Sequence, residues 1–517
     1  MQVTYLDLLE RRERLGRNVG ALDFLIEYVR KKNFLQSHDQ VYYYCSEKSN
    51  KYIKAKVTNS GVGHPQKSQK LNNLVDCAAA LRSVQMLQSY LELISLLIDN
   101  INALERRKQL KLLGHIKIAF LLSADQDFLV RLRKKNEAFF KKIHLPEEVI
   151  KTLDDDLGGL VRKGDSVNDL VFDAHEDAKK IEFFLRSEYI DHALFEQKFG
   201  LELNLAALKR DSDAYLKTLN RLFFESGLKG IGQVDLCSEN VLSTLNVDMA
   251  EEKTSQERGL VSIIVSCFNS EDTITYALRS LLCQTYKNIE ILVCDDRSED
   301  DSLNAILALA EKDKRIKVFK SRLNQGTYNI RNALLKISEG EYISFHDSDD
   351  WAHPQKLEKQ LEFMLRNDVP VCSTRWIRMD PKGRAIFFVD GKIYRFCVVS
   401  TMVKREVFSI IPKFRQSVVA ADTEFHEACI QLLGEEKVKV LDKPLVLGLW
   451  GDNSLTKRNG LEAENTGHVA ERRRKYSEIA ARQRVFGSGI VTDNDVRDVL
   501  VENGIYREFS GVDEVKV

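Results

Sequence analysis

From Leu260 onward, short apolar segments alternate with segments of helical periodicity, which is typical of a mostly parallel sheet with helices packed on it. Strands are expected at 261–265, 289–294 and 316–319, and a fourth strand runs into His346. Helices are expected at 271–284, at 301–312 and ahead of Ser338. Ligands bind such sheets at the carboxyl ends of the strands. This part of the chain is therefore predicted to be an α/β domain with its site at that edge.

The first 237 residues have a different character. Apolar residues recur three and four positions apart from Leu74 to Ile101, which places them on one stripe of a long helix. Further helical stretches are expected at 116–143, 167–187 and 202–226. These patterns predict a large all-α domain, built as a bundle or as helical hairpins. A coiled-coil seam, through which this domain would form an oligomer, is the alternative.

Four parts are therefore expected along the 517 residues, because a chain of this length exceeds one ordinary core. They are an all-α domain over 1–237, a polar linker over 238–258, the α/β domain over 259–457 and a helical tail over 458–517.

Composition excludes several functions. The 77 basic and 77 acidic residues give no net charge, so no nucleic-acid partner is expected. The nine cysteines contain no C-x-x-C pair, which favours reduced thiols and no structural zinc. The N-terminus does not resemble a signal peptide, and no apolar run reaches the ~18 residues of a membrane span. A cytoplasmic protein is expected. The basic segment 471–476 suggests peripheral contact with the cytosolic face of the inner membrane, against an ordinary solvated helix face.

The fourth expected strand ends in three carboxylates within four positions, Asp347, Asp349 and Asp350. Because like charges this close repel, a divalent cation such as Mg²⁺ or Mn²⁺ would stabilise them. The alternative is a solvated turn that caps the helix beginning near Pro354. Asp296 follows the second strand of the same sheet, so both acidic clusters can face one crevice. That convergence favours a binding site.

Four segments, taken in order, resemble glycosyltransferase family 2, the nucleotide-diphospho-sugar transferases with a GT-A fold. Residues 261–269 resemble its opening strand and nucleotide loop. Residues 295–300 resemble its V-D-D-G-S-x-D motif, with Arg297 in place of the glycine. Residues 324–343 resemble its N-x-G…R-N…G-x-Y-I stretch, and residues 346–351 resemble its D-x-D site.

The resemblance implies a Rossmann-like GT-A domain and an inverting transfer from a nucleotide-diphosphate donor, usually a UDP-sugar, with Mn²⁺ or Mg²⁺ as cofactor. Asp349 would be the principal metal ligand, and Asp347 would contact the ribose or assist the metal. The residues expected around the donor nucleoside are Phe268, Asn269, Glu271, Asp296 and Arg331.

The family also supplies an acidic base near the start of a later helix, and the matching residue is Asp422. The alternative is that Asp422 merely caps a helix running to about Leu433, and His426 is a weaker contender for the base. Trp351 and Glu424 are expected to contact the sugar or the acceptor, although a tryptophan at a strand end is often core.

One departure concerns the leaving group. Many relatives carry a basic residue shortly before a terminal S-L-T-like segment, whereas here none precedes Ser454, so the task passes to the metal, Lys457 or Arg458. The predicted function is transfer of a sugar to a glycan or lipid-linked glycan in capsule or lipopolysaccharide synthesis. The alternative is a catalytically inactive GT-A-like scaffold or interaction protein of a glycan-assembly complex. The intact carboxylates favour the enzyme.

Overall fold

The structure is a computed structural model. Apart from single positions and short pieces between 94 and 115 and between 454 and 501, it describes residues 174–187, 193–246, 258–388, 391–411, 413–451 and 506–516. Two compact units are present, and each is described by itself. The first comprises Met1–Lys163, Ile430–Glu435 and Leu455–Asn503, and the second comprises Gly164–Cys429, Glu436–Ser454 and Gly504–Val517. Most of the described residues lie in the second unit.

A nine-stranded sheet forms the centre of the second unit, with the order β5-β8-β6-β7-β4-β1-β2-β3-β9 in the described part of the chain. The strands are β1 (Val261–Cys267), β2 (Ile289–Asp295), β3 (Ile316–Lys320), β4 (Tyr342–Asp347), β5 (Trp351–Ala352), β6 (Val371–Met379), β7 (Tyr394–Lys404), β8 (Val438–Leu449) and β9 (Asp513–Val515). Strands β4, β1, β2 and β3 are mutually parallel, as the alternating sequence predicted. The other half of the sheet is mixed.

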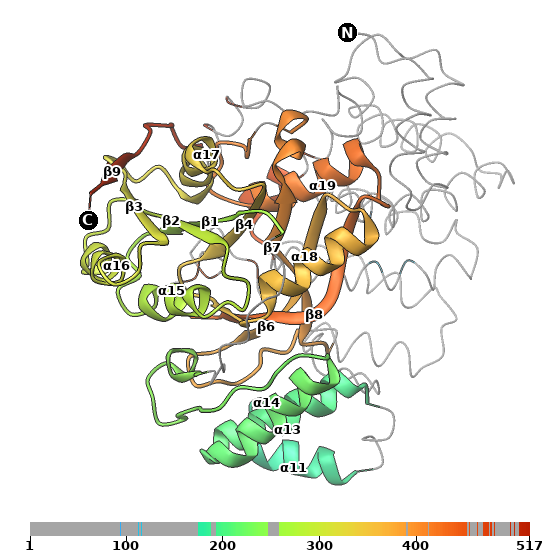
Figure 1. Ribbon diagram of the computed structural model, residues 1–517. Coiled ribbons are helices and arrows are strands. Elements are labelled where there is room, and N and C mark those ends of the chain that lie inside the picture. Colours follow the sequence, from blue (N-terminus) through green and yellow to red (C-terminus); the bar gives the residue numbers. More distant parts are fainter. Residues whose placement is uncertain are drawn as a thin grey trace, which may run out of the picture. The chain divides into compact units, whose positions relative to one another are not determined.

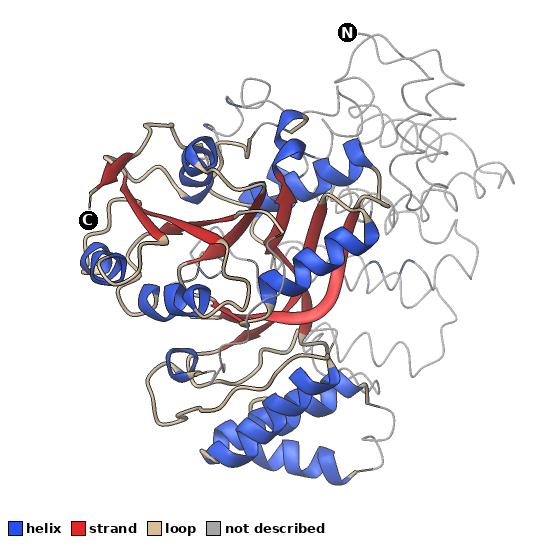
Figure 2. Cartoon of the chain, viewed as in Figure 1, coloured by secondary structure: helices blue, strands red, loops and turns tan. Residues whose placement is uncertain are grey.

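Helices cover the parallel strands. These helices are α15 (Ile274–Leu282), α16 (Ser302–Ala310) and α17 (Thr327–Ile337). Later in the chain come α18 (Lys356–Asn367), η4 (Arg405–Ser409) and α19 (Ala421–Leu433). Helices α15 and α16 lie on one face of the sheet and α17 on the other (Figure 1). Every residue of β2 is buried, because helices on both faces exclude water from a parallel strand. The alternation of strands and helices is plain in Figure 2.

Three helices precede the sheet: α11 (Ala178–Arg186), α13 (Phe195–Lys209) and α14 (Ser212–Glu225). The sequence predicted one helix over 202–226, but Arg210 adopts a left-handed conformation (φ 55°) that ends α13. The Asp211 carboxylate then accepts the N–H of Ala214 at 3.0 Å and starts α14. A capping aspartate thus outweighs the continuous helical periodicity.

These helices share a hydrophobic core with the sheet. The Asn204 side chain of α13 accepts the N–H of Ala385 at 2.6 Å and donates to its carbonyl at 3.0 Å. The start of the predicted linker also packs, since η3 (Val241–Thr244) buries Val241, whose N–H donates to the carbonyl of Pro381 at 2.8 Å. The division of the chain into four parts stays a prediction.

The tail was expected to be helical, yet its residues 513–515 form strand β9, which pairs antiparallel with β3. A strand there covers the edge of β3, which would otherwise expose unpaired backbone groups. The Gln325 side chain links the tail to α17, because it donates to the carbonyl of Gly511 at 2.7 Å and accepts the N–H of Ser510 at 2.9 Å.

Little of the sequence predicted to be helical before residue 144 is among the described residues. The stretch 116–143 lies outside the described residues, and of the apolar stripe only Ile94 is described, as a buried helical position. Within the described residues, no helix has the length and apolar content needed to cross a membrane.

Candidate active site

Three carboxylates gather where β4 ends. Oxygen atoms of Asp347, Asp349 and Asp350 lie within 4.8 Å of one another. Asp350 is buried, and its Oδ2 has no hydrogen-bond partner among the described residues. An orphaned buried oxygen beside two more carboxylates suits a hard divalent cation, which takes oxygen ligands. The predicted cluster is therefore assembled at the carboxyl end of a parallel strand, and its donor set fits the ion.

The cluster is electrostatically unfavourable without a cation. Burial raises the pKa of Asp349 to about 6, and the neighbouring charge of Asp347 adds to the effect. Burial also raises the pKa of Asp350 well above its usual range, and both neighbouring carboxylates reinforce that shift. Asp347 itself is paired with the guanidinium of Arg331 at 2.7 Å, and Arg331 is only 2% exposed. Arg331, predicted to contact the nucleoside, thus holds a carboxylate of the cluster in this structure.

The turn that carries the cluster is tied to other elements. Asp350 Oδ1 accepts the N–H of Leu449 at the end of β8, at 3.2 Å. The Tyr276 hydroxyl of α15 donates to the carbonyl of Asp349. Helix α18 begins after Gln355, which makes no side-chain cap bond, and the N–H of Leu357 in its first turn donates to the Gln284 side chain at 3.1 Å. The alternative reading of the carboxylates as caps of this helix is therefore wrong.

The loop after β1 is braced against the loop after β2. The Asn269 side chain accepts the N–H of Glu299 at 2.9 Å, and the Glu271 carboxylate accepts the N–H of Asp301 at 2.8 Å. Phe268 is half-buried in the same loop. The two loops are thereby held as one surface beside the acidic turn, since the Ser270 hydroxyl lies 2.9 Å from that of Ser348.

Asp296 fastens a third loop to this surface. Its carboxylate accepts the N–H groups of Gln325 at 2.9 Å and Gly326 at 2.7 Å, ahead of α17. Burial raises its pKa to about 6 despite these two bonds. Asp296 does not cap α16, because the N–H of Ser302 is taken by Asp300 at 3.0 Å.

The predicted base lies in the first turn of α19. Asp422 is half-buried, and its carboxylate accepts the N–H of the adjacent Thr423 at 2.7 Å within the first turn. A capping carboxylate makes a bond of this kind, so the base role and the cap role of Asp422 both stay predictions. No hydrogen bond or ion pair among the described residues joins it to the carboxylate cluster. Glu424 is buried, and each of its carboxylate oxygens lies 2.8 Å from a nitrogen of Arg415. That pairing leaves Asp422 as the more accessible carboxylate of the two.

Other predicted residues lie elsewhere. Trp351 is 3% exposed, and its ring meets that of His353 edge-on at 6.0 Å. The buried indole is part of the core and offers no open face to a sugar. Lys457 lies in the first compact unit, and Arg458 lies outside the described residues.

Sequence reasoning missed Arg378, on β6. Its charge opposes the rise in the pKa of Asp349 and Asp350, so this cation lies near the cluster. An arginine in a strand carries no signal of its own. The residues beside it in the folded protein come from β8 and from the turn after β4, which a single sequence cannot align with it.

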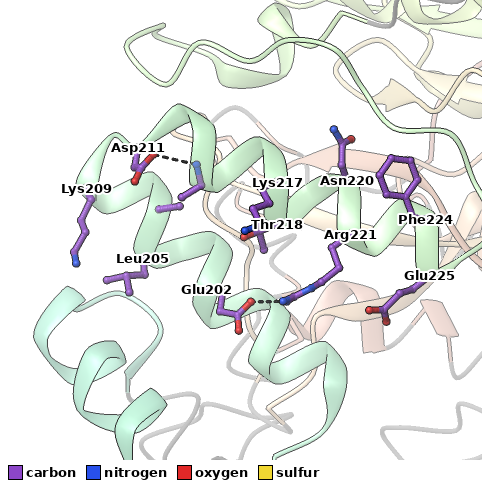
Figure 3. Close-up of a pocket in the computed structure, with 12 residues that line it drawn as sticks. Glu202, Leu205, Lys209, Asp211, Lys217, Thr218, Asn220, Arg221, Phe224 and Glu225 are labelled. Carbon is purple, nitrogen blue, oxygen red and sulfur yellow. Dashed lines mark hydrogen bonds and ion pairs between the residues drawn. The ribbon is translucent and has the colours of Figure 1, made fainter.

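A separate hollow lies between α13 and α14 (Figure 3). Its wall includes the exposed pair of Glu202 with Arg221, together with Phe224. None of the predicted site residues lines it. The carboxyl ends of the parallel strands, with their carboxylates and braced loops, thus remain the site. This combination defines an α/β protein with its candidate site at the carboxyl ends of the parallel strands.

Residues 262–396 match the family model described as "Glycosyl transferase family 2". This part of the chain is a glycosyl transferase family 2 domain. The predicted family is confirmed there, and the sheet with its helices has the expected α/β architecture.

Similar proteins include an uncharacterized glycosyltransferase of Haemophilus influenzae, 36% identical over 162 residues, which are 29% of this chain and 65% of that protein. Another is the UDP-Glc:alpha-D-GlcNAc-diphosphoundecaprenol beta-1,3-glucosyltransferase WfaP of Escherichia coli, 47% identical over 105 residues, 20% of this chain and 41% of that protein. The chain thus spans less than two thirds of the length of these curated relatives. Among solved structures, S. aureus TarS 1–349 in complex with UDP-GlcNAc is 21% identical, with a TM-score of 0.34 over 47% of this chain and 71% of that chain.

Proposed function

We propose that this protein is an inverting, metal-dependent glycosyltransferase that moves a sugar from a UDP-sugar to a hydroxyl of a glycan acceptor. The observation that carries the proposal is the carboxylate cluster, with oxygens of Asp347, Asp349 and Asp350 within 4.8 Å of one another beside the braced loops. The family match and a relative named as a UDP-glucose-dependent transferase support it. The names of two such relatives refer to a diphosphoundecaprenol-linked sugar, which favours a lipid-linked acceptor in capsule or lipopolysaccharide synthesis.

The carboxylate cluster and the loops beside it would bind different parts of the donor. Asp349 and Asp347 would hold Mn²⁺ or Mg²⁺, and Arg331 keeps Asp347 aimed, through their 2.7 Å ion pair. The nucleoside would lie against the loop from Phe268 to Glu271 and the loop that Asp296 fastens. The bound ion would supply positive charge to the departing diphosphate.

The transfer itself needs a base. Asp422 takes the proton of the acceptor hydroxyl, the acceptor oxygen forms a bond to the anomeric carbon, and the bond from that carbon to the diphosphate oxygen breaks with its electron pair. Attack from the face opposite the leaving group inverts the configuration at that carbon. The protein would perform this step from the cytoplasm, at the inner face of the membrane where lipid-linked acceptors are found.

Nucleotide binding tests the metal role. Wild-type protein is expected to bind UDP more tightly with Mn²⁺ than with a chelator, and Asp349→Ala should abolish that difference. Asp442→Ala is the matched control, since Asp442 is an exposed carboxylate paired only with Arg375 among the described residues, and it should leave the difference intact. Equal UDP binding with and without metal in the wild type would refute the assigned site.

A panel of nucleotide sugars, scored for metal-dependent release of the nucleotide with acceptor extract present, tests the activity. At least one UDP-sugar should be consumed. Asp422→Asn should keep UDP binding and lose transfer, because the carboxamide cannot accept the proton. Substantial residual turnover would redirect the base assignment to His426, and silence of the wild type across the panel would favour the scaffold alternative.

A further inference from the structure

Arg378 lies on β6 with its guanidinium over the ring of Trp376 and near that of Trp450. Its Cζ is 3.8 Å from the ring centroid of Trp376 and 5.1 Å from that of Trp450. Such stacking fixes the plane of a guanidinium and leaves its N–H groups free to point along that plane. The side chain is therefore positioned before any ligand arrives.

The neighbouring strand makes room for this arrangement. Gly448 of β8 is paired in register with Arg378. A Cβ at Gly448 would lie 2.8 Å from the Trp376 ring and 3.3 Å from Cδ of Arg378. A side chain at this position would displace the indole and the guanidinium together.

The same strand end connects Arg378 to the carboxylate cluster. One guanidinium nitrogen donates to the carbonyl of Leu449 at 3.1 Å, and the N–H of Leu449 donates to Asp350 at 3.2 Å. A single residue thus holds the cation and the acid side by side. The two side chains form no ion pair with each other among the described contacts.

Arg378 has unused hydrogen-bonding capacity. Its Nε is buried and has no partner, and the carbonyl of Leu449 is its one hydrogen-bond acceptor among the described residues. A guanidinium carries five N–H donors and suits phosphate oxygens, which it binds in pairs. A pre-positioned cation that forms no ion pair among the described residues, next to a carboxylate cluster that fits a divalent ion, suits an anionic diphosphate.

We propose that Arg378 binds the donor diphosphate and stabilises the charge that the leaving group acquires. This assignment rests on the proposed function. When the acceptor oxygen bonds to the anomeric carbon, the electron pair of the broken bond stays on the β-phosphate oxygen, and the acceptor proton passes to Asp422. Arg378 thus shares the stabilisation of the leaving group, which the sequence left to the metal, Lys457 or Arg458.

Comparison of UDP with UMP in Mn²⁺ tests this assignment by calorimetry, without turnover. A lost charged hydrogen bond weakens binding by roughly 10- to 100-fold, so Arg378→Gln should weaken UDP by at least about tenfold. UMP lacks the β-phosphate and should change less than about threefold. Gly448→Ala should act in the same direction by displacing the guanidinium.

Two controls separate this role from a structural one. Arg375→Gln alters a half-exposed arginine of the same strand and should leave both affinities unchanged. Mn²⁺ binding without nucleotide should be unchanged or tighter in Arg378→Gln, because a repelling cation is removed. Equal losses for UDP and UMP, weaker Mn²⁺ binding, or unchanged UDP affinity would each overturn the assignment to Arg378 alone. A wild type that binds no UDP would instead overturn the proposed function, and this assignment with it.

Discussion

Arg297 departs from the family pattern without changing the turn it belongs to. Its φ is +62°, a left-handed conformation in which glycine is unstrained and a side chain is not. Its guanidinium donates to the carbonyl of Arg322 at 3.2 Å. We infer that the braced loops on either side hold Arg297 in this strained backbone conformation.

Replacing this arginine should stabilise the protein. We expect Arg297→Gly to raise the free energy of unfolding by about 1 kcal/mol. A non-glycine residue in the left-handed region costs the folded state roughly 1–3 kcal/mol. Glycine removes that strain, but it also increases the entropy of the unfolded chain, which offsets part of the gain. Urea unfolding followed by fluorescence measures it. Arg297→Ala keeps the strain and should give no gain. A loss of stability in the glycine variant would mean that the contact with Arg322 outweighs the strain.

Glu424 was predicted to contact the sugar or the acceptor, but its buried ion pair with Arg415 indicates a structural role. Glu424→Gln leaves the buried charge of Arg415 without its carboxylate, so we expect a loss of about 3–5 kcal/mol in unfolding free energy. Asp442→Asn, in an exposed pair with Arg375, should cost less than about 1 kcal/mol. Similar small losses for both variants would show that Glu424 is free for another task.

At the scale of elements, the loop before α17 is held from two directions. Asp296 fastens its backbone from the end of β2, and the Gln325 side chain joins it to the segment 506–516. The loop therefore couples the predicted nucleoside site to the tail strand.

Gln325→Ala should loosen that coupling. It removes bonds to Gly511, Ser510 and the hydroxyl of Ser321, the last at 2.8 Å, so we expect a loss of about 2 kcal/mol and faster hydrogen exchange in β3. Arg322→Ala, which breaks only an exposed pair with Asp513, should change β3 exchange little. If the two variants behave alike, Gln325 does not anchor the tail.

Much of the element order could be predicted from the sequence, since local patterns encode it. The strands at 261, 289 and 316 begin where the apolar runs begin, and the acidic cluster follows β4 as expected. The predictions that failed concern features that depend on tertiary structure. The break at Arg210 needed a backbone angle that no periodicity reveals, and β9 pairs with a strand far earlier in the chain, with Asp513 opposite Lys320.

The site divides in the same way. The three carboxylates lie close together in the chain, so their meeting was predictable. The pairing of Arg331 with Asp347 joins a helix to a strand end, and Arg378 approaches from the far half of the sheet. A single sequence holds no record of such contacts, because each residue alone is compatible with a solvated surface.

At the scale of the whole molecule, helices α11, α13 and α14 and the sheet should unfold together. All three tryptophans of the chain, at 351, 376 and 450, lie in or beside the sheet, so indole fluorescence reports on the sheet alone. Asn204→Leu, in α13, removes three buried hydrogen bonds, so the free energy of unfolding should fall by about 2–4 kcal/mol. The urea midpoint of the fluorescence signal should fall with it. Lys217→Leu on the neighbouring helix α14 should not lower it. An unchanged midpoint in Asn204→Leu would indicate an independent helical domain.

The strand β9 also has a consequence for synthesis. The ribosome makes β3 long before it makes the residues that cover its edge, and the roughly 190 residues between the two strands take about 10–40 s at roughly 5–20 residues per second. During that interval the nascent sheet presents an open strand to other nascent chains on the same message. We therefore expect this fold to depend on chaperones during translation, while the open edge of β3 has no strand paired with it.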